Sequence, residues 1–505
     1  MTVTTMAESE YIWSTLASNP TIYLWTVLAV TGLSLFLSKR INKDDDDKSN
    51  IPWAPGAVPI LGHALEYRKD PSGFLLRSSQ SVGSVFQLNL AGKHMYVVCG
   101  PKEQKFLANM PESKLSARKA VAEIGFEQTL GTLNVHQGTD IHKGIIKGIW
   151  HSPSNNNKTK SNQVAKWMTS IQRAMTEELP TRQQDFLQWI RRIMLRVTIE
   201  QMIGTAFLDQ WDENKTGGIS FLDEFMSFQD ALEDVTAKSV VLPKWLALLT
   251  MLWPLQKRRE RFQSTIATHL TSILSKHAND HRDEQYLGFW LNALLSEYSV
   301  DDISEFIIGL LFAAHKNPAI GTAQAFLIFQ EQCNGETIDG VLLKESKQLV
   351  ETPDWSTLQS CDRLRRWCLE TLRVTAHSIG GVRTAQHDIP IGDTNYIIPK
   401  GGSVGFSHIV PNINPDNWSS ASEFSFGHSE SLYQDEYRFT TFSHGVHKCP
   451  GQQLALVLLQ CTLASLLTSY DVSLPEAIPP LSFERATLAQ REAPVMVTIR
   501  KRDQA

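Results

Sequence analysis

Hydrophobic and polar positions follow a helical period over two long stretches of this sequence. Val300–Gln330 is the longest helical run, and Gln452–Leu467 is an apolar run with leucines and alanines at helical spacing. Ser84–Leu90 and His94–Cys99 alternate or carry runs of β-branched residues, which predicts two strands. From Pro101 onward the chain is mostly helical. The pattern therefore predicts a mainly α protein with small β-sheets (α+β).

A further apolar run lies near the N-terminus. Thr21–Leu37 is uncharged and long enough, at the short end of the range, to span a bilayer. Acidic residues precede it, where a cleaved signal peptide would carry basic ones, and basic residues follow it. By the positive-inside rule the C-terminal side faces the cytosol. The sequence predicts an uncleaved, single-pass transmembrane helix. The flanking charges are Glu8, Glu10, Lys39, Arg40 and Lys43.

Two segments separate this anchor from the body of the protein. Asp44–Asp47 and the flanking lysines form a solvated charge run. Ile51–Gly62 carries three prolines, which forbid a helix and favour a stiff, extended chain. We expect three parts: an anchor over 1–40, a charged linker and proline-rich hinge over 41–62, and one large catalytic domain over 63–505.

Composition and charge narrow the function. Hydrophobic residues make up 42% of the 505 residues, enough for a large core, and the net charge of −5 gives no support for a nucleic-acid partner. Leu242–Leu255 is too apolar for a surface loop, and Lys257–Arg259 is basic. That pairing favours a segment lying in a membrane interface, with a buried core helix as the alternative.

A short cysteine-containing loop lies just before the second helical run. Its residues Phe442, Gly445, His447, Cys449 and Gly451 form one pattern. A cysteine before a helix meets free backbone N–H groups and the positive end of the dipole, which favours a metal-binding thiolate. The two glycines allow a flat ligand to approach the loop. A lone cysteine would more simply be a buried core residue.

Together these five residues resemble the haem-thiolate loop of the cytochrome P450 family, FxxGx(R/H)xCxG. The resemblance implies that Cys449 is the axial ligand of haem iron, that Phe442 covers the sulfur, and that His447 reaches a haem propionate. The proline-rich hinge is similar to that of membrane-bound members of the family. The resemblance implies one large mixed domain with the cytochrome P450 fold.

The long helical run is similar to the family's central oxygen-binding helix. Ala313 and Ala314 match the small residues beside the haem, but Lys316 stands in the acid position and Asn317 in the threonine position. The usual acid–alcohol proton relay is therefore missing. Pro318 lacks an N–H, which leaves the Ala314 carbonyl without its helical partner and predicts a kink.

Proton delivery must then follow another route. Asn317 can donate a hydrogen bond to dioxygen but cannot ionise, so water or His315 must supply the protons. An asparagine here resembles the branch with cholesterol 7α-hydroxylase and prostacyclin synthase, beside sterol 14α-demethylase. That branch includes an isomerase, so Asn317 leaves the reaction type open.

A buried network is expected beneath the haem. Glu370 and Arg373 lie three apart, hence on one helix face, and match the family's ExxR pair. His428 stands where the family places its third partner. A surface ion pair is the alternative.

Further cations are implied for the haem propionates. Arg383 aligns with one propionate ligand. Lys143 and Lys147 lie on a basic helix in the region that carries another, although a solvated face is the alternative.

The resemblance implies an O2-dependent monooxygenase that oxidises a lipophilic substrate, such as a terpenoid, steroid or related specialised metabolite. It implies heme b, an NADPH-dependent cytochrome P450 reductase, membrane lipid as a partner, and a site on the cytosolic face of the endoplasmic reticulum. The resemblance implies that the reductase docks at the basic face near Arg365, Arg366 and Lys448, with a solvated surface as the alternative. Two alternatives remain: a haem-thiolate isomerase or dehydratase, and a non-catalytic haem carrier or sensor. His377 offers a polar contact to substrate.

Overall fold

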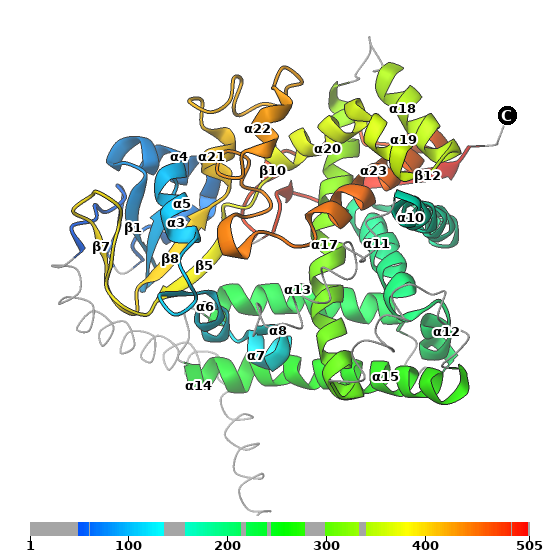
Figure 1. Cartoon of the computed structure of the whole chain (residues 1–505), viewed down its shortest axis with the longest axis horizontal. Coiled ribbons are helices and arrows are strands. Elements are labelled where there is room, and N and C mark those ends of the chain that lie inside the picture. The colour runs from blue at the N-terminus through cyan, green and yellow to red at the C-terminus, as the bar shows by residue number, and fades with distance from the viewer. Residues whose placement is uncertain are drawn as a thin grey trace, which may run out of the picture.

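The computed structural model describes residues 49–59, 61–135, 157–213, 219–239, 244–277, 298–332, 340–485 and 487–502. The expected anchor and most of the charged linker lie outside these ranges. Figure 1 shows a sheet-containing part, with α3, α4 and α5, beside a larger helical part through which α17 runs. The mainly helical fold with small sheets is confirmed.

Most of the described chain is helical. The helices are α3 Ala64–Lys69, α4 Pro71–Val82, α5 Pro101–Ala108, α6 Ala117–Glu123, α7 Phe126–Thr129, α8 Thr132–Val135, α10 Asn157–Glu177, α11 Phe186–Ile203, α12 Ala206–Glu213, α13 Phe221–Ser239, α14 Lys244–Ala247, α15 Trp253–His277, α17 Val300–Gln332, α18 Gly340–Glu351, α19 Trp355–Ser360, α20 Asp362–Val374, α21 Ile409–Ile413, α22 Glu430–Gln434 and α23 Gln452–Ser469. A π-helical turn, η1, spans Leu248–Leu252, and a 3-10 turn, η4, spans Gly445–His447.

The strands form four small sheets. Their bounds are β1 Val85–Leu90, β2 Lys93–Val98, β3 Leu115–Ser116, β4 Gln184–Asp185, β5 Ile379–Ala385, β6 Ile389–Pro390, β7 Ile397–Ile398, β8 Ser403–Ser407, β9 Tyr470–Ser473, β10 Leu481–Ser482, β11 Gln490–Arg491 and β12 Met496–Lys501. The largest sheet has the order β1-β2-β8-β5-β3, and a three-stranded sheet has the order β4-β12-β9. β10 pairs with β11, and β6 pairs with β7.

The first hairpin of the five-stranded sheet consists of the two strands that the sequence pattern predicts. β1 and β2 pair antiparallel with Val85 opposite Val98 and Leu90 opposite Lys93. The turn passes through Ala91 and Gly92, both at positive φ. The predicted pair of strands is confirmed. Three of the four strand ends lie one residue away from the predicted positions, and the fourth is the same.

The helix α17 occupies the centre of the helical part and packs against α11, α15, α20 and α23. From Pro318 to Phe329 every residue is buried, so this half is enclosed on all sides and is mostly apolar. Gly321 allows close approach, because a Cβ there would lie 3.1 Å from both Leu372 on α20 and Leu459 on α23. The predicted helix is confirmed, and it passes through Pro318 as one element.

Two further segments consist of short elements. The stretch 113–138 contains β3, α6, α7 and α8 as far as the described residues reach. Its short helices were missed because each is at most seven residues long, too short to show a period. The apolar segment around Trp253 comprises α14, η1 and the start of α15.

A buried charge cluster attaches α13 to α17. The Nζ atom of Lys316, 2% exposed, lies 2.8 Å from Asp230 Oδ1 and 2.5 Å from Glu233 Oε2. Arg191 on α11 donates two further hydrogen bonds to Asp230, at 2.9 and 3.0 Å. Two cations therefore face two carboxylates, and the cluster is neutral as a whole.

The protonation of this cluster follows from the same contacts. Burial raises the pKa of Glu233, and its Lys316 partner only partly offsets that effect. Burial also acts to raise the pKa of Asp230, but the charges of Arg191 and Lys316 outweigh it and lower the pKa. Lys316 is thus the cation on which Glu233 depends for its charge.

We expect Lys316→Met to destabilise the protein by about 3 kcal/mol, because it leaves a buried carboxylate without its cation. Adding Glu233→Gln should restore more than half of the loss, since the stranded charge is then removed as well. The measurement is the midpoint of thermal unfolding of the purified holoprotein. Lys347→Met, at a lysine whose side chain is 73% exposed, is the control and should change little. Equal midpoints for Lys316→Met and this control would contradict the prediction.

Candidate functional site

The cysteine loop connects η4 to the start of α23. Its backbone is closed by the Cys449 N–H, which donates to the Phe442 carbonyl at 2.7 Å, and by the Lys448 N–H, which donates to Gly445 at 3.2 Å. Gly445 has a φ of 63°, and a Cβ there would lie 2.6 Å from the Ala108 carbonyl oxygen. Glycine is therefore required at 445 for both conformation and space.

Gly451 was also expected to be needed for the approach of a flat ligand, but its backbone differs from that of Gly445. It is the N-cap residue of α23 with a φ of −89°, which any residue can adopt. A Cβ there would lie 3.9 Å from Cys449 Sγ, an ordinary contact. The backbone at 451 does not need glycine, although a side chain would begin to cover the sulfur.

The thiol of Cys449 is held close to the start of α23. Burial raises its pKa, and the backbone N–H of Gly451 offsets only part of that shift. The Gly451 N–H at the helix start thus acts in the direction that favours a thiolate, and a metal cation at the sulfur would add to that stabilisation. The thiolate expected at Cys449 stays a prediction.

Glu370 and Arg373 form a fully buried pair below the loop. The Arg373 Nε and Nη2 groups donate to the two Glu370 carboxylate oxygens at 2.8 and 2.7 Å. The remaining N–H groups of the guanidinium donate to three backbone carbonyls at 2.5–2.6 Å, so all five donors are used. Those carbonyls belong to Asn412, Ala421 and Glu423. This is a bidentate buried ion pair and not a surface pair.

The carboxylate of Glu370 is satisfied by three further groups. The Ser425 N–H donates at 2.8 Å, the Tyr433 hydroxyl donates at 2.6 Å, and His428 Nδ1 lies at 3.3 Å. His428 thus occupies the place expected of it. Tyr433 was missed, because nothing near it in the sequence indicates a partner 63 residues upstream.

Asn412 links the Glu370–Arg373 pair to the cysteine loop. Its Nδ2 group donates to the Arg373 carbonyl at 3.1 Å and to Thr441 Oγ1 at 2.8 Å. Its Oδ1 atom accepts a hydrogen bond from the Thr440 N–H at 2.8 Å. The Thr440 hydroxyl lies 3.0 Å from the same oxygen and donates to the His408 carbonyl at 2.6 Å. Thr440 and Thr441 immediately precede Phe442. The buried pair therefore fixes the position at which the cysteine loop begins.

A corner that contains Arg383, His447 and Glu112 lies between the loop and the five-stranded sheet. Arg383 on β5 is 3% exposed and donates to the carbonyls of Leu107 and Ala108 at 3.3 and 3.0 Å. Burial lowers its pKa to about 10. His447 Nε2 lies 3.4 Å from Glu112 Oε2. Burial and the charge of Arg383 lower the pKa of His447.

Two buried histidines complete this corner. The ring of His408 lies 5.9 Å from that of His444, and burial lowers the pKa of both. His444 Nε2 lies 2.9 Å from Gln104 Oε1, whose own Nε2 donates to two carbonyls. His444 must therefore donate from Nε2. His408 has no hydrogen-bond partner on either nitrogen within the described chain.

One face of α17 remains accessible in the first half of the helix. Leu310, Ala313, Ala314 and Asn317 are spaced by three and four residues and are not buried, while the residues from Pro318 to Phe329 all are. Phe312 contacts the ring of Phe126 on α7, with centroids 6.3 Å apart. The small residues Ala313 and Ala314 thus lie on a face that can accept a ligand.

Asn317 lies on the accessible face of α17, whereas its neighbours His315 and Lys316 are buried. Asn317 Oδ1 accepts a hydrogen bond from the Leu488 N–H at 3.4 Å. His315 is fully buried, its Nδ1 group donates to the Leu311 carbonyl at 2.6 Å, and burial lowers its pKa to about 3. Its ring packs near Phe225 on α13. His315 therefore lies on the buried side of α17 as a neutral side chain.

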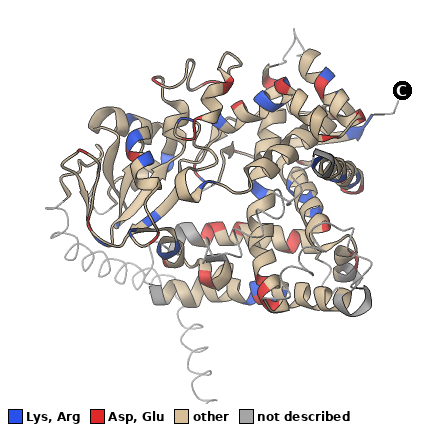
Figure 2. Cartoon of the chain, in the orientation of Figure 1, with Lys and Arg blue, Asp and Glu red and all other residues tan. Residues whose placement is uncertain are grey.

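The remaining predicted residues do not join this site. Lys143 and Lys147 lie outside the described residues. Arg365 pairs with Glu430, Arg366 donates to the carbonyls of Phe426 and His428, and Lys448 lies 2.9 Å from Glu436. Figure 2 shows basic and acidic positions interspersed along the helices. The three expected docking residues are thus engaged within the fold.

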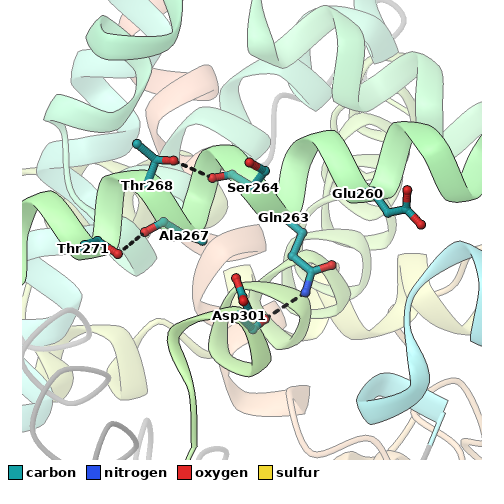
Figure 3. A pocket seen from close by; sticks show the side chains of 7 residues that line it. All are labelled: Glu260, Gln263, Ser264, Ala267, Thr268, Thr271 and Asp301. Carbon is teal, nitrogen blue, oxygen red and sulfur yellow. Dashed lines mark hydrogen bonds between the residues drawn. The ribbon is translucent and has the colours of Figure 1, made fainter.

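An open surface hollow of about 580 Å³ lies elsewhere, between α15 and the start of α17. Figure 3 shows its polar lining, in which Gln263 donates to the Asp301 carbonyl at 3.0 Å. None of its lining residues belongs to the cysteine loop or to the accessible face of α17. The hollow is therefore separate from the site.

Comparison with known proteins gives the family. The family model for cytochrome P450 matches residues 52–499. The chain is 24% identical to abscisic acid 8'-hydroxylase 1 of Arabidopsis thaliana, over 94% of this chain and 97% of that protein. It is 24% identical to lanosterol 14-alpha demethylase of Eremothecium gossypii, over 85% and 84%. It is 21% identical to a probable lanosterol 14-alpha demethylase of Acanthamoeba polyphaga mimivirus, over 87% of this chain and 61% of that longer protein.

The chain belongs to the cytochrome P450 family, and it is a haem-thiolate monooxygenase with likeness to the sterol 14-alpha demethylases. The residues present fit haem. Arg383 is a buried cation on which the charge of Glu112 acts, but no carboxylate lies at ion-pair distance from it among the described residues, so an anionic partner such as a propionate fits there. The sulfur of Cys449, a residue of intermediate exposure, is a suitable soft ligand for iron.

Proposed function

We propose that this monooxygenase oxidises a lipophilic substrate, a terpenoid, steroid or related specialised metabolite, with electrons from an NADPH-dependent cytochrome P450 reductase. The accessible face of α17 carries the proposal, because Leu310, Ala313 and Ala314 give it an apolar surface. The names of the relatives add support, since they include sterol demethylases and an abscisic acid hydroxylase. An apolar guest is the ligand that such a surface stabilises.

Cys449 is the proposed axial ligand. Haem held by a cysteine thiolate supplies the chemistry of O–O bond cleavage and oxygen insertion. The loop contributes the position of the sulfur, which the Phe442 carbonyl, the glycine at 445 and the Asn412 contacts fix. Phe442 is buried and covers the side of the loop that faces Phe439.

Arg383 and His447 are proposed to bind the propionate edge. Arg383 lies on β5 and His447 lies in η4 beside the cysteine loop. Among the described residues, no carboxylate lies at ion-pair distance from Arg383. A propionate there would supply charge-assisted hydrogen bonds to a guanidinium that burial otherwise destabilises. The same partner would stabilise the charged form of His447.

Asn317 is the proposed hydrogen-bond donor to dioxygen, and Ala314 leaves space for it on the same face. Asn317 cannot transfer a proton by ionising. His315 is buried on the other side with a pKa near 3, so we give it no proton step. Ordered water on the accessible face is the proposed proton carrier.

A membrane location on the cytosolic face of the endoplasmic reticulum is proposed from one surface. Leu248, Leu249 and Trp253 are 42%, 55% and 56% exposed, and they are followed by Lys257 and Arg258. Aromatic and aliphatic side chains beside cations suit the interface of a bilayer. The helix α23 is long and apolar enough to span a membrane, but it is 67% buried within the described fold, as a core helix would be.

Replacement of Cys449 tests the proposed ligand. Cys449→Ala should abolish the red-shifted Soret band of the reduced carbon monoxide complex, because no sulfur then remains at the iron. Product formation from terpenes and sterols, measured by mass spectrometry, should require NADPH and the reductase in the wild type and vanish in the variant. Cys461→Ala, at another buried cysteine, is the matched control. A surviving band in Cys449→Ala, or turnover without NADPH, would overturn the proposal.

Replacement of Arg383 tests the propionate contact. Arg383→Gln should speed haem loss to apomyoglobin about tenfold or more, since a charge-assisted hydrogen bond contributes about 1.5–3 kcal/mol. Arg118→Gln, at an exposed arginine near Glu112, is the control and should lose haem at the wild-type rate. Unchanged haem loss in Arg383→Gln would remove Arg383 from the haem site.

A fluorophore at the proposed membrane surface tests the location. Leu249→Cys labelled with a polarity-sensitive dye should show blue-shifted emission when the full chain is reconstituted in phosphatidylcholine bilayers, because the dye enters the interface. Val341→Cys on α18, where the native side chain is 57% exposed, should show no shift. Wild-type protein carried through labelling gives the background. Identical emission at both positions would argue against the proposed surface.

A further inference from the structure

The C-terminal hairpin of β10 and β11 lies along one stripe of α17. Three polar residues of α17 contact it: Asn317, Gln324 and Glu331. They are spaced by seven residues, which places them on the same side of the helix over four turns. The hairpin is therefore attached to α17 from the dioxygen region to the end of the helix.

Arg491 is the main anchor of the hairpin. Its Nη1 and Nη2 groups donate to the two carboxylate oxygens of Glu331 at 2.7 and 2.8 Å, and its Nε group donates to Gln324 Oε1 at 2.9 Å. Nη1 also donates to the Pro479 carbonyl at 3.0 Å. The Arg491 side chain is 6% exposed. A bidentate, nearly buried guanidinium holds its partners in a defined geometry.

The other end of the hairpin loop reaches the accessible region of α17. The Ala489 N–H donates to the Thr375 carbonyl at 2.8 Å, and the Leu488 N–H donates to Asn317 Oδ1 at 3.4 Å. Leu488 is 3% exposed and packs in the same core as α17. Gln490 donates to the Thr487 hydroxyl at 2.9 Å, which ties the loop to itself. The loop is thus held by both α17 and the segment after α20.

This contact determines which end of the Asn317 amide is free. A backbone N–H can only donate, so the acceptor must be Oδ1 and not Nδ2. Nδ2 is left as a donor, and among the described residues none accepts a hydrogen bond from it. Asn317 lies on the accessible stripe with Leu310, Ala313 and Ala314. The hairpin therefore leaves the donor end of the amide for a ligand on that face.

We propose that the C-terminal hairpin is a second arm of the dioxygen site, in which the Leu488 N–H orients Asn317 with Nδ2 available to the ligand. Arg491 is then a positioning residue that acts on Asn317 through the hairpin, although its own contacts are with Gln324 and Glu331. This inference rests on the proposed role of Asn317 and extends it to residues that are more than 170 positions away in sequence.

The first test separates the two functions of the amide by hydrogen exchange of the peptide containing Leu488, in ferric holoprotein. Asn317→Asp keeps an acceptor for the Leu488 N–H, so its exchange should match the wild type. Asn317→Leu removes the acceptor at similar size, and exchange should be about five- to tenfold faster. Wild-type exchange in Asn317→Leu would show that Asn317 does not hold the hairpin and would overturn the proposal.

The second test uses carbon monoxide as the probe ligand and infrared spectroscopy of its stretching band at pH 8. A hydrogen-bond donor beside the ligand lowers that frequency. Asn317→Leu and Asn317→Asp should both raise it, because both lack Nδ2. Arg491→Gln should broaden the band or shift it in the same direction although Asn317 is intact, and it should also speed exchange at Leu488.

The control for this variant is Arg500→Gln, at an exposed arginine on β12. It should leave both the exchange and the carbon monoxide band unchanged. A wild-type carbon monoxide band in Arg491→Gln, together with fast exchange, would show that the hairpin does not position Asn317. If the wild-type protein lacked the thiolate-type Soret band, the proposed haem site would fail, while the exchange experiment would still report on the hairpin.

Discussion

The buried pair of Glu370 and Arg373 is the constraint on which the site depends. Two opposite charges removed from water are stabilised only when every donor and acceptor is satisfied. Here the guanidinium uses all five donors, and the carboxylate receives hydrogen bonds from Ser425 and Tyr433 as well. Three of the acceptors are the backbone carbonyls of Asn412, Ala421 and Glu423, which precede the cysteine loop. The hydrogen bonds that satisfy the Arg373 guanidinium therefore also determine the path of that segment. Asn412 carries the constraint onward to the residues before Phe442.

The helix α17 has two faces with different surroundings. One face is accessible and carries small and apolar residues with the Asn317 amide, which suits a nonpolar guest beside dioxygen. The other face is buried and carries Lys316, whose charge is neutralised by Asp230 and Glu233 from α13. The carboxylates on α13 therefore pair with Lys316 on the buried side of α17 and do not replace the family's acid beside the accessible face. The proposed dioxygen site would then depend on the orientation of the Asn317 amide and on water.

The sequence predicted those parts of the protein that are local. The hairpin of β1 and β2, the two long helices, the cysteine loop and the Glu370–Arg373 pair all rest on patterns within a few residues. Contacts between distant segments could not be predicted in this way. Tyr433 reaches Glu370, and Leu488 reaches Asn317, only through the packing of separate elements. The thiolate expected at Cys449 stays a prediction, because its stability depends on the burial of the sulfur and on a bound metal, and neither follows from the local sequence.

Ligation of haem iron by the Cys449 sulfur is the proposal on which the others depend. X-ray absorption at the iron edge of purified wild-type holoprotein reports which elements are bound to the metal. We expect one sulfur atom in the first coordination shell, together with the four porphyrin nitrogens. A first shell of nitrogen and oxygen alone would contradict it.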